Sequence, residues 1–230
     1  MNKDICIVVP IYNEEKIIDK VIEELKSNTK NLNSKLILIN DGSKDATLEK
    51  LRKYENDKNI FVINKENEGH GKTILKGYEY AIQNNYKFIF QIDSDDQFYP
   101  GEIVNFIQKL NGEKLLIGKR VERKDQFIRL IITNIMKLII FFFHGVFLKD
   151  ANCPFRLIEV NFLSNHINKI QNSIIPNVLI SILAAKEKSL KYINVSHKER
   201  KTGEVSIKKW KLLVFCFNSF KEIIFFKWRK

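Results

Sequence analysis

The chain has 230 residues, 44% of them hydrophobic, which is enough for one substantial core and too little for two separate catalytic domains. Its 39 Lys and Arg against 27 Asp and Glu give a net charge of +12, which suits a partner that carries phosphate. The three cysteines are far apart and odd in number, so they indicate neither a disulfide framework nor a zinc site. The short apolar run near the N-terminus does not fit a secretory signal, so we expect a cytoplasmic protein.

Short apolar runs alternate with helical patterns through the first half of the chain. The apolar runs predict strands at 5–10, 35–40, 60–64, 87–93 and 115–118. Apolar residues at helical spacing predict helices around 17–25, 48–54, 74–82 and 103–110. This alternation predicts an α/β fold with a mostly parallel sheet that helices cover on both faces.

Polar loops follow three of the predicted strands. Residues 10–14 follow the first strand, Asp41-Gly42-Ser43 the second and Asp93-Ser94-Asp95 the fourth. Taken singly, each loop also fits a helix cap or an ordinary turn. Ligands of parallel sheets bind at the carboxyl ends of the strands, so the three loops together favour a binding crevice.

The acidic loop after the fourth strand predicts a site for a divalent cation. Asp93 and Asp95 are two residues apart, and oxygen ligands of this kind bind hard cations that also bridge to substrate phosphates. Successive side chains alternate in an extended chain, so Gln97 lies on the same side as Asp93 and Asp95 and offers a carbonyl oxygen. Asp96 is expected to point to the other side.

Two nucleotide-binding motifs are not supported by the sequence. The segment 69–73, GHGKT, resembles the end of a Walker A loop, but Glu66 occupies the position of its first glycine. The first strand is followed by residues 10–13, PIYN, and not by a glycine-rich dinucleotide fingerprint. His70 either faces the crevice or lies in a solvated loop, of which the solvated loop is the simpler interpretation.

Several short motifs together resemble family 2 glycosyltransferases with the GT-A fold. The motifs in the first half are 8–15, VVPIYNEE; 40–45, NDGSKD; 67–71, NEGHG; and 93–95, DSD. Those in the second half are 118–120, GKR; 150–156, DANCPFR; and 200–206, RKTGEVS. The second set is similar to the branch that contains dolichyl-phosphate and polyprenyl-phosphate sugar transferases, although Cys153-Pro154 replaces the usual Ser-Gly.

The resemblance implies a nucleotide-diphosphate sugar donor, Mg²⁺ or Mn²⁺, and a lipid phosphate acceptor. The residues expected around the donor and the metal are Pro10, Tyr12, Glu14, Asp41, Asp93, Ser94, Asp95 and Gln97. Among them, Asp93 would contact the donor, and Asp95 and Gln97 would hold the metal with it. The residues expected to meet phosphate groups are Arg120, Arg156, Arg200, Ser206 and Lys208. We count Asp93, Asp95 and Arg120 as the catalytic set.

The acceptor can be inferred from a missing carboxylate. An inverting transferase that acts on a hydroxyl needs a general base, usually an Asp or Glu late in the domain. The segment 172–179, NSIIPNVL, contains none. Because a phosphate acceptor is already anionic, this favours a lipid phosphate. Two alternatives stay open. One is transfer to a sugar hydroxyl in polysaccharide synthesis, and the other is a non-catalytic module that binds nucleotides or nucleic acid. Of the partners, we do not expect nucleic acid.

Two hydrophobic segments in the second half point towards a membrane surface. Residues 128–148 are interrupted by polar side chains, which favours burial in the core or an interfacial position over a membrane span. Residues 207–230 form a basic amphipathic helical tail that suits an anionic membrane surface or a docking position on the protein itself. We therefore expect a GT-A domain at 1–206, with a nucleotide-binding half at 1–118 and an acceptor half at 119–206, and a tail helix at 207–230. The protein is expected to be peripheral on the inner face of the membrane.

Overall fold

The computed structural model describes residues 4–121, 127–199 and 209–227. Its strands are β1 (Ile5–Ile11), β2 (Ser34–Asp41), β3 (Ile60–Lys65), β4 (Phe88–Gln91), β5 (Leu115–Arg120), β6 (Arg156–Glu159) and β7 (Leu190–Val195). Its helices are α1 (Ile18–Thr29), α2 (Thr47–Arg52), α3 (His70–Gln83), α4 (Glu102–Gln108), α5 (Phe127–His144), α6 (Val160–Ile170), α7 (Pro176–Lys186) and α8 (Lys209–Phe225). The five predicted strands and four predicted helices of the first half are all present.

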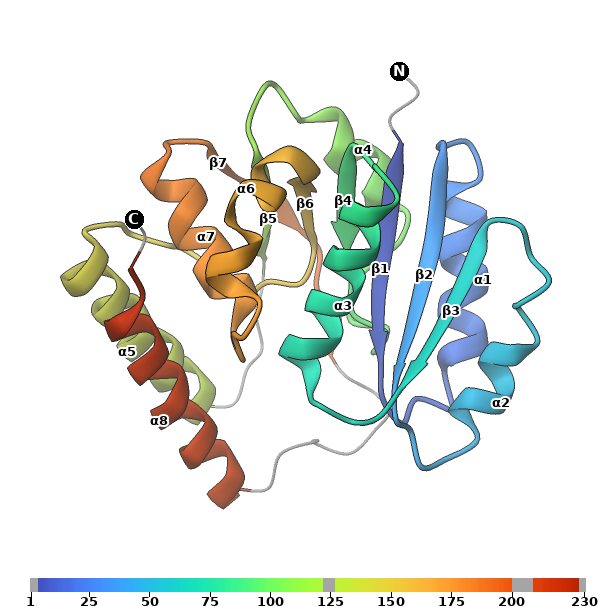
Figure 1. The fold of residues 1–230 in the computed structure, drawn as a ribbon, viewed down its shortest axis with the longest axis horizontal. Coiled ribbons are helices and arrows are strands. Elements are labelled where there is room, and N and C mark those ends of the chain that lie inside the picture. Colours follow the sequence, from blue (N-terminus) through green and yellow to red (C-terminus); the bar gives the residue numbers. More distant parts are fainter. Residues whose placement is uncertain (1–3, 122–126, 200–208, 228–230) are drawn as a thin grey trace.

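The strands form one sheet in the order β3-β2-β1-β4-β6-β5-β7 (Figure 1). All pairs are parallel except those of β6, which lies antiparallel between β4 and β5. The predicted α/β fold with a mostly parallel sheet is therefore confirmed. β6 and β7 were not predicted, since β6 is only four residues long and β7 has a single buried residue, Val195.

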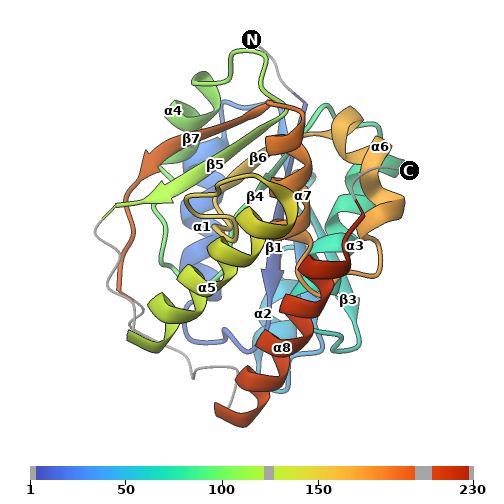
Figure 2. The same ribbon diagram turned by 90° about the vertical axis from the view of Figure 1, so that its left-hand side faces the viewer.

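Helices cover both faces of the sheet (Figure 2). One face carries α1, α2 and α4, and the other carries α3, α6 and α7, as expected for a parallel sheet that is buried on both sides. β1 at the centre is buried along its whole length. α7 is buried from Pro176 to Ala184, and its sequence is apolar apart from Asn177, Ser181 and Lys186.

α5 and α8 pack against each other beside this sandwich (Figures 1 and 2). β1 starts near the N-terminus at the top of Figure 1, so the carboxyl ends of the parallel strands lie at the lower edge, towards α5 and α8. The strand ends and the α5–α8 pair therefore share one side of the molecule. In the part of the chain that the structure describes, no helix combines the length and hydropathy needed to cross a membrane.

Candidate active site

The ends of β1 and β4 are tied together by a buried hydrogen bond. Ser94 Oγ donates to the carbonyl oxygen of Pro10 over 2.9 Å. This bond brings the acidic loop after β4 against the loop after β1. In the loop after β1, Asn13 has a left-handed backbone (φ 54°) and contacts the loop after β2. Its side-chain Oδ1 accepts from Lys44 N over 2.8 Å, and its backbone N–H donates to Ser43 Oγ over 3.0 Å. Three strand ends, those of β1, β2 and β4, thus converge as predicted.

Asp41 at the end of β2 holds the loop that precedes α3. Its carboxylate accepts from Lys65 Nζ at 2.5 Å and from the backbone N–H groups of Glu68 and Gly69 at 3.0 Å each. Although burial opposes the charged form, these hydrogen bonds lower the pKa of Asp41 below its usual value. Both carboxylate oxygens are used inside the protein, so the described structure gives Asp41 a structural role. The nucleotide contact stays a prediction.

Three side chains of the acidic loop, those of Asp93, Asp95 and Gln97, line one cavity. Asp95 Oδ1 accepts from the backbone N–H of Gln97 over 3.2 Å, which closes an Asx-type turn. Asp93, Asp95 and Gln97 all line the same cavity of about 330 Å³. Among the described residues, Asp93 Oδ1 is buried and has no hydrogen-bond partner, and His70 Nε2 lies 3.6 Å from it. His70 thus lies beside Asp93, but its side chain is 53% exposed, so the solvated interpretation also stays a prediction.

These oxygens fit a hard divalent cation. Asp93 brings a buried oxygen without a hydrogen-bond partner among the described residues, and Asp95 and Gln97 bring a second carboxylate and an amide carbonyl. Among the described residues, no three His, Cys, Asp or Glu side chains converge into a complete metal site. Mg²⁺ in such sites is held by one or two carboxylates together with substrate phosphates, which matches an incomplete protein ligand set.

Arg120 at the end of β5 is oriented by Asp150. Its Nε and Nη2 donate to the two oxygens of Asp150 over 2.8 and 2.9 Å, a bidentate pair with side-chain exposures of 13% and 8%. Burial opposes the charge of Arg120, but the Asp150 carboxylate raises the pKa of the guanidinium above its usual value. Both residues line the cavity, so a fixed positive group lies in the same space as the acidic loop.

The position of Arg156 does not agree with the predicted phosphate contact. Its side chain is fully buried, and the guanidinium donates to the backbone carbonyls of Ala151, Cys153 and Asn177 over 2.6–2.9 Å. A guanidinium saturated by carbonyl oxygens inside the core cannot reach a ligand in the cavity. Arg156 instead fixes the loop that carries Asp150, and so supports Arg120 from a distance.

The cavity combines a charged floor with apolar walls. Its polar and charged lining consists of Asp93, Asp95, Gln97, Arg120, Asp150, Asn152, Thr133, His197 and Ser219. The remaining lining consists of Phe98, Ile132, Met136, Pro154, Ile175, Val178, Phe215, Cys216 and Phe220. α5 and α8 supply most of the apolar wall. A ligand in this cavity therefore meets charged side chains as well as apolar ones.

Sequence reasoning missed several of these residues. Asp150 lies in a quoted motif but carries no sequence signal that pairs it with Arg120. His197 follows a strand that was not predicted, and the tail helix α8 was expected on a membrane surface or docked on the protein, but not as part of the site. Pro10 is buried and Tyr12 half-buried at the end of β1, and Glu14 N donates to Thr47 Oγ1. Arg200, Ser206 and Lys208 lie outside the described residues.

The fold and the acidic strand ends define a GT-A type glycosyltransferase domain. The sequence model of glycosyl transferase family 2 matches residues 6–164. The chain belongs to glycosyl transferase family 2. Glucosyl-3-phosphoglycerate synthase from Mycobacterium tuberculosis, solved with Mn²⁺, UDP and glucosyl-3-phosphoglycerate, superposes with a TM-score of 0.68 and 14% identity over 96% of this chain and 77% of that chain. This likeness shows the shared fold.

Relatives with closer sequences include two named lipid-phosphate transferases. A dolichyl-phosphate beta-glucosyltransferase of Trichomonas vaginalis is 30% identical over 193 residues, which cover 72% of this chain and 58% of the relative. An undecaprenyl-phosphate 4-deoxy-4-formamido-L-arabinose transferase of Photorhabdus laumondii is 27% identical over 222 residues, 94% of this chain and 66% of the relative. An uncharacterized Methanocaldococcus jannaschii protein is 31% identical over 171 residues, 69% of this chain and 72% of that protein. The chain spans less than two thirds of the length of the two named transferases.

Proposed function

We propose that this protein transfers a sugar, with inversion, from a nucleotide-diphosphate sugar to a polyprenyl phosphate. The observation that carries the proposal is the cavity in which Arg120 and the acidic loop face apolar residues of α5 and α8. A polyprenyl phosphate has the same division into an anionic head and an apolar chain. Two named relatives act, by their names, on dolichyl phosphate and undecaprenyl phosphate, which supports the choice.

The carboxylates in the cavity also favour a phosphate acceptor over a hydroxyl. Three carboxylates line it, and Asp150 is committed to its bidentate pair with Arg120. Asp93 and Asp95 are the residues that fit the donor and its cation. No further Asp or Glu lines this cavity among the described residues, so a sugar hydroxyl would meet no separate general base. A phosphate oxygen attacks the anomeric carbon without losing a proton.

The side chains of this protein then have distinct tasks. Arg120, held by Asp150, binds and orients an anionic oxygen, and Asp93 accepts from donor hydroxyls or approaches the cation. Asp95 and Gln97 would hold Mg²⁺ or Mn²⁺, which neutralises charge on the departing diphosphate. The apolar walls from α5 and α8 exclude water from the acceptor end, which protects the donor from hydrolysis.

We also propose that the protein docks peripherally on an anionic membrane through α5 and α8. One face of α8 packs on the protein through Cys216, Ser219 and Ile223, and the Ile223 carbonyl lies 2.7 Å from His144 Nε2 of α5. Part of the predicted apolar stripe of the tail faces outwards, since Leu213 and Phe217 are 60% and 63% exposed, whereas Phe220 of the same stripe lines the cavity. The exposed part of α8 is the surface that we propose for the membrane.

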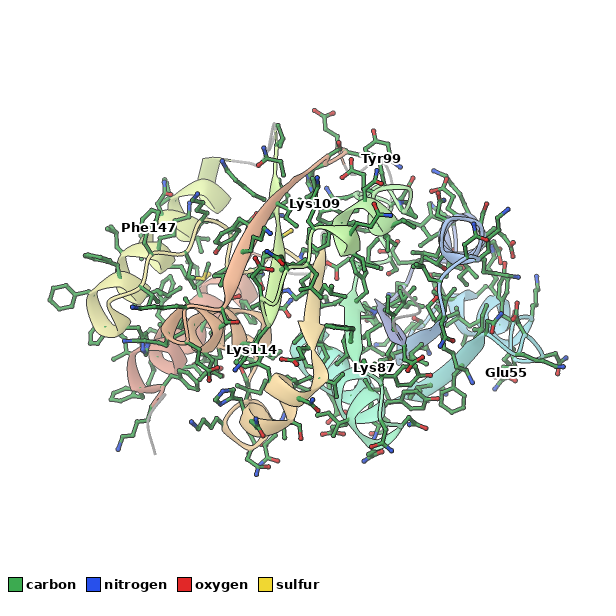
Figure 3. All side chains as sticks on the ribbon, turned by 90° about the horizontal axis from the view of Figure 1, so that it is seen from above. Glu55, Lys87, Tyr99, Lys109, Lys114 and Phe147 are labelled. Atoms are coloured by element: carbon green, nitrogen blue, oxygen red, sulfur yellow. The ribbon has the colours of Figure 1, made fainter. Side chains whose placement is uncertain are left out.

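α5 packs against α8 and enlarges this apolar surface. Its exposed members on α5 and the following loop are Ile131, Ile135, Leu138, Phe141, Phe142, Phe143 and Phe147. Phe147 projects away from the body of the molecule, on the opposite side from Glu55 (Figure 3). Aromatic surface of this extent on one side, with lysines around it, suits the interface of an anionic bilayer.

The experiment that tests the proposed function offers the purified protein a panel of nucleotide sugars with two kinds of acceptor. Polyprenyl phosphate in detergent or vesicles is expected to yield a glycolipid with an inverted anomeric centre. Oligosaccharide acceptors carry only hydroxyls and are expected to yield no product. A product formed solely on hydroxyl acceptors would overturn the lipid phosphate assignment. Transfer that persists in excess chelator would overturn the proposed requirement for Mg²⁺ or Mn²⁺.

A further inference from the structure

The third acid of the loop, Asp96, is held by two lysines on the outside of the cavity. Asp96 Oδ2 lies 2.5 Å from Lys20 Nζ of α1, and Asp96 Oδ1 lies 2.9 Å from Lys198 Nζ beyond β7. Asp96 has φ +58°, a left-handed conformation that is costly for a residue other than glycine and needs support from its surroundings. Neither lysine lines the cavity that contains Asp95, so these contacts do not involve a ligand there.

The backbone of Lys198 is paired with Gln97 as well. Lys198 N–H donates to the Gln97 carbonyl over 2.8 Å, and Gln97 Nε2 donates to the Lys198 carbonyl over 3.2 Å. The amide nitrogen of Gln97 is thereby directed to Lys198, and its carbonyl oxygen is not used in this contact, while the residue lines the cavity. The orientation of a predicted metal ligand is thus set by the residue beyond β7.

Aromatic contacts complete the attachment of this segment to the acidic loop. Lys198 Nζ lies 4.2 Å from the centre of the Tyr99 ring, within cation–π range. The neighbouring His197 ring packs edge-on against Phe98 with centroids 5.1 Å apart. Tyr99 lies at the edge of the molecule beside β7 (Figure 3). Residues 96–99 are therefore fixed from outside by one short segment.

We propose that Lys198 is a positioning residue for the cation-binding loop, which keeps Asp95 and Gln97 directed into the cavity by holding Asp96 and Gln97 from behind. This inference rests on the proposed function, because it concerns the cation of that reaction. Groups behind the ligands of a metal site orient them, and their loss typically weakens metal binding about 10–100-fold when the contact is buried. Lys198 is partly exposed, with a side-chain exposure of 21%, so a smaller effect is expected here.

The test measures Mn²⁺ binding directly, by the electron paramagnetic resonance signal of free Mn²⁺, with and without UDP and with no acceptor present. Lys198→Met removes the charge and keeps the aliphatic length, and we expect the Kd for Mn²⁺ to rise roughly three- to tenfold. Lys198→Arg is expected to restore binding. The matched control is Lys191→Met on β7, because Lys191 pairs with Glu113 over 3.1 Å away from the loop and should leave the Kd unchanged.

A double-mutant cycle with Asp96→Asn shows whether Lys198 acts through Asp96. Asn tolerates the left-handed conformation, so Asp96→Asn removes the charge without forcing the backbone to change. If the proposal is right, the double variant binds Mn²⁺ no more weakly than either single variant. Additive losses, or a Lys198→Met Kd within twofold of the unchanged protein, would overturn it. Melting temperatures of all variants separate this effect from general destabilisation.

One further variant separates failure of this inference from failure of the proposed function. Asp95→Ala is expected to lose Mn²⁺ binding altogether. If Asp95→Ala binds Mn²⁺ as tightly as the unchanged protein, the cation site itself is placed wrongly, and the role of Lys198 falls with it. If Asp95→Ala loses binding while Lys198→Met does not, only the positioning role is wrong.

Discussion

The bidentate pair of Arg120 with Asp150 couples the stability of the domain to the geometry of its cavity. Both side chains are largely buried, so removal of the carboxylate leaves a buried guanidinium without its partner. We expect Asp150→Asn to lower the free energy of unfolding by about 2–4 kcal/mol, as for other broken buried pairs. Urea denaturation followed by circular dichroism measures this change.

The control for that measurement is Glu187→Gln. Glu187 pairs with Lys114 over 3.0 Å, but this pair is exposed: the side chain of Glu187 is 34% exposed and that of Lys114 is 42% exposed. Exposed pairs of this kind contribute at most about 1 kcal/mol. Equal losses of stability in Asp150→Asn and Glu187→Gln would contradict the structural importance of the buried pair.

Asp41 predicts a pH dependence of stability. Its pKa is lower in the folded protein than the unfolded value of about 3.9, in spite of burial, because Lys65 and two backbone N–H groups bind the carboxylate. The sign follows from this direction: the stabilisation is complete above about pH 4 and is lost as the pH falls through the folded pKa. Asp41→Asn should therefore destabilise the protein by about 1–2 kcal/mol at pH 7.

The difference between Asp41→Asn and the unchanged protein should narrow below about pH 4, where the carboxyl of the unfolded chain takes up its proton, and should close only below the lower pKa of the folded carboxyl. Urea midpoints at pH 7, 4.5, 3.5 and 3 follow this trend. The exposed Glu55 provides a control, because Glu55→Gln should show no such pH-dependent difference. A difference for Asp41→Asn that stays constant over this range would show that the charge of Asp41 contributes nothing.

Residue types alone could predict where the site lies but not what each residue does in it. Asp93, Asp95 and Gln97 follow from their spacing after a strand, and the structure places all three in one cavity. Arg156 could not be assigned correctly, because the carbonyl groups that surround it come together only when residues 151, 153 and 177 meet in the folded chain. When the sequence shows no partner for a charged residue, the residue is predicted to contact a ligand or to lie on the surface, as Arg156 was.

At the scale of elements, α3 approaches the sheet closely because of a glycine. A Cβ at Gly77 would lie 2.4 Å from Val8 Cγ1 and 2.9 Å from Ile39 Cδ1, both in the buried core. Gly77→Ala gains about 1 kcal/mol of helix propensity, but overpacking of this kind costs about 1–3 kcal/mol. We expect a net loss of stability of up to about 2 kcal/mol, measured by urea denaturation.

A second glycine serves as the control for this prediction. At Gly101, before α4, the nearest atom to an added Cβ is Asn28 Oδ1 at 3.3 Å, a side-chain atom that can move aside. Gly101→Ala should therefore change stability by less than about 0.5 kcal/mol. If Gly77→Ala proves as stable as Gly101→Ala, then α3 is free to shift on the sheet. The close approach of α3 to β1 and β2 would then not fix the start of this helix, where His70 lies.

Periodicity predicted the elements of the first half because each has a buried face of its own. The predicted strand at 115–118 extends to Arg120, so the sheet carries this side chain to the edge of the cavity. β6 escaped prediction because its four residues, RLIE, are defined by pairing with β4 and β5 and not by a pattern within them. The antiparallel insertion of β6 depends on contacts between residues far apart in sequence, which a local pattern does not record.

At the scale of the whole molecule, charge and apolar surface coincide on one side. In residues 131–149 and 213–227 the only carboxylate is Glu222, and it accepts from Ile174 N over 3.2 Å. The same segments contain four lysines: Lys137, Lys149, Lys221 and Lys227. The sequence predicted the basic helical tail, but it could not show that α5 lies beside α8 and adds its own exposed apolar residues.

This arrangement predicts how the protein partitions onto vesicles. The full chain should sediment with sucrose-loaded vesicles that contain anionic lipid and much less with neutral ones, and added salt should weaken the binding. Phe142 is 84% exposed and Phe217 63% exposed, so their replacement removes apolar contact with lipid at little cost to the fold. Since a buried Phe contributes about 1.5–3 kcal/mol, Phe142→Ser with Phe217→Ser should weaken partitioning by roughly tenfold or more.

The control for membrane binding is Phe61→Ser, at the opposite edge of the sheet from α5 and α8. Phe61 lies on the edge strand β3 and is 41% exposed, so it tests whether loss of any exposed aromatic ring has the same effect. Only the variant with changes on α5 and α8 should leave the vesicles. Unchanged partitioning of that variant, or equal binding to neutral and anionic vesicles, would contradict docking through this surface. Because the cavity with Arg120 lies directly against the same two helices, loss of docking should also raise the apparent KM for a vesicle-borne acceptor while leaving the KM for the soluble donor unchanged.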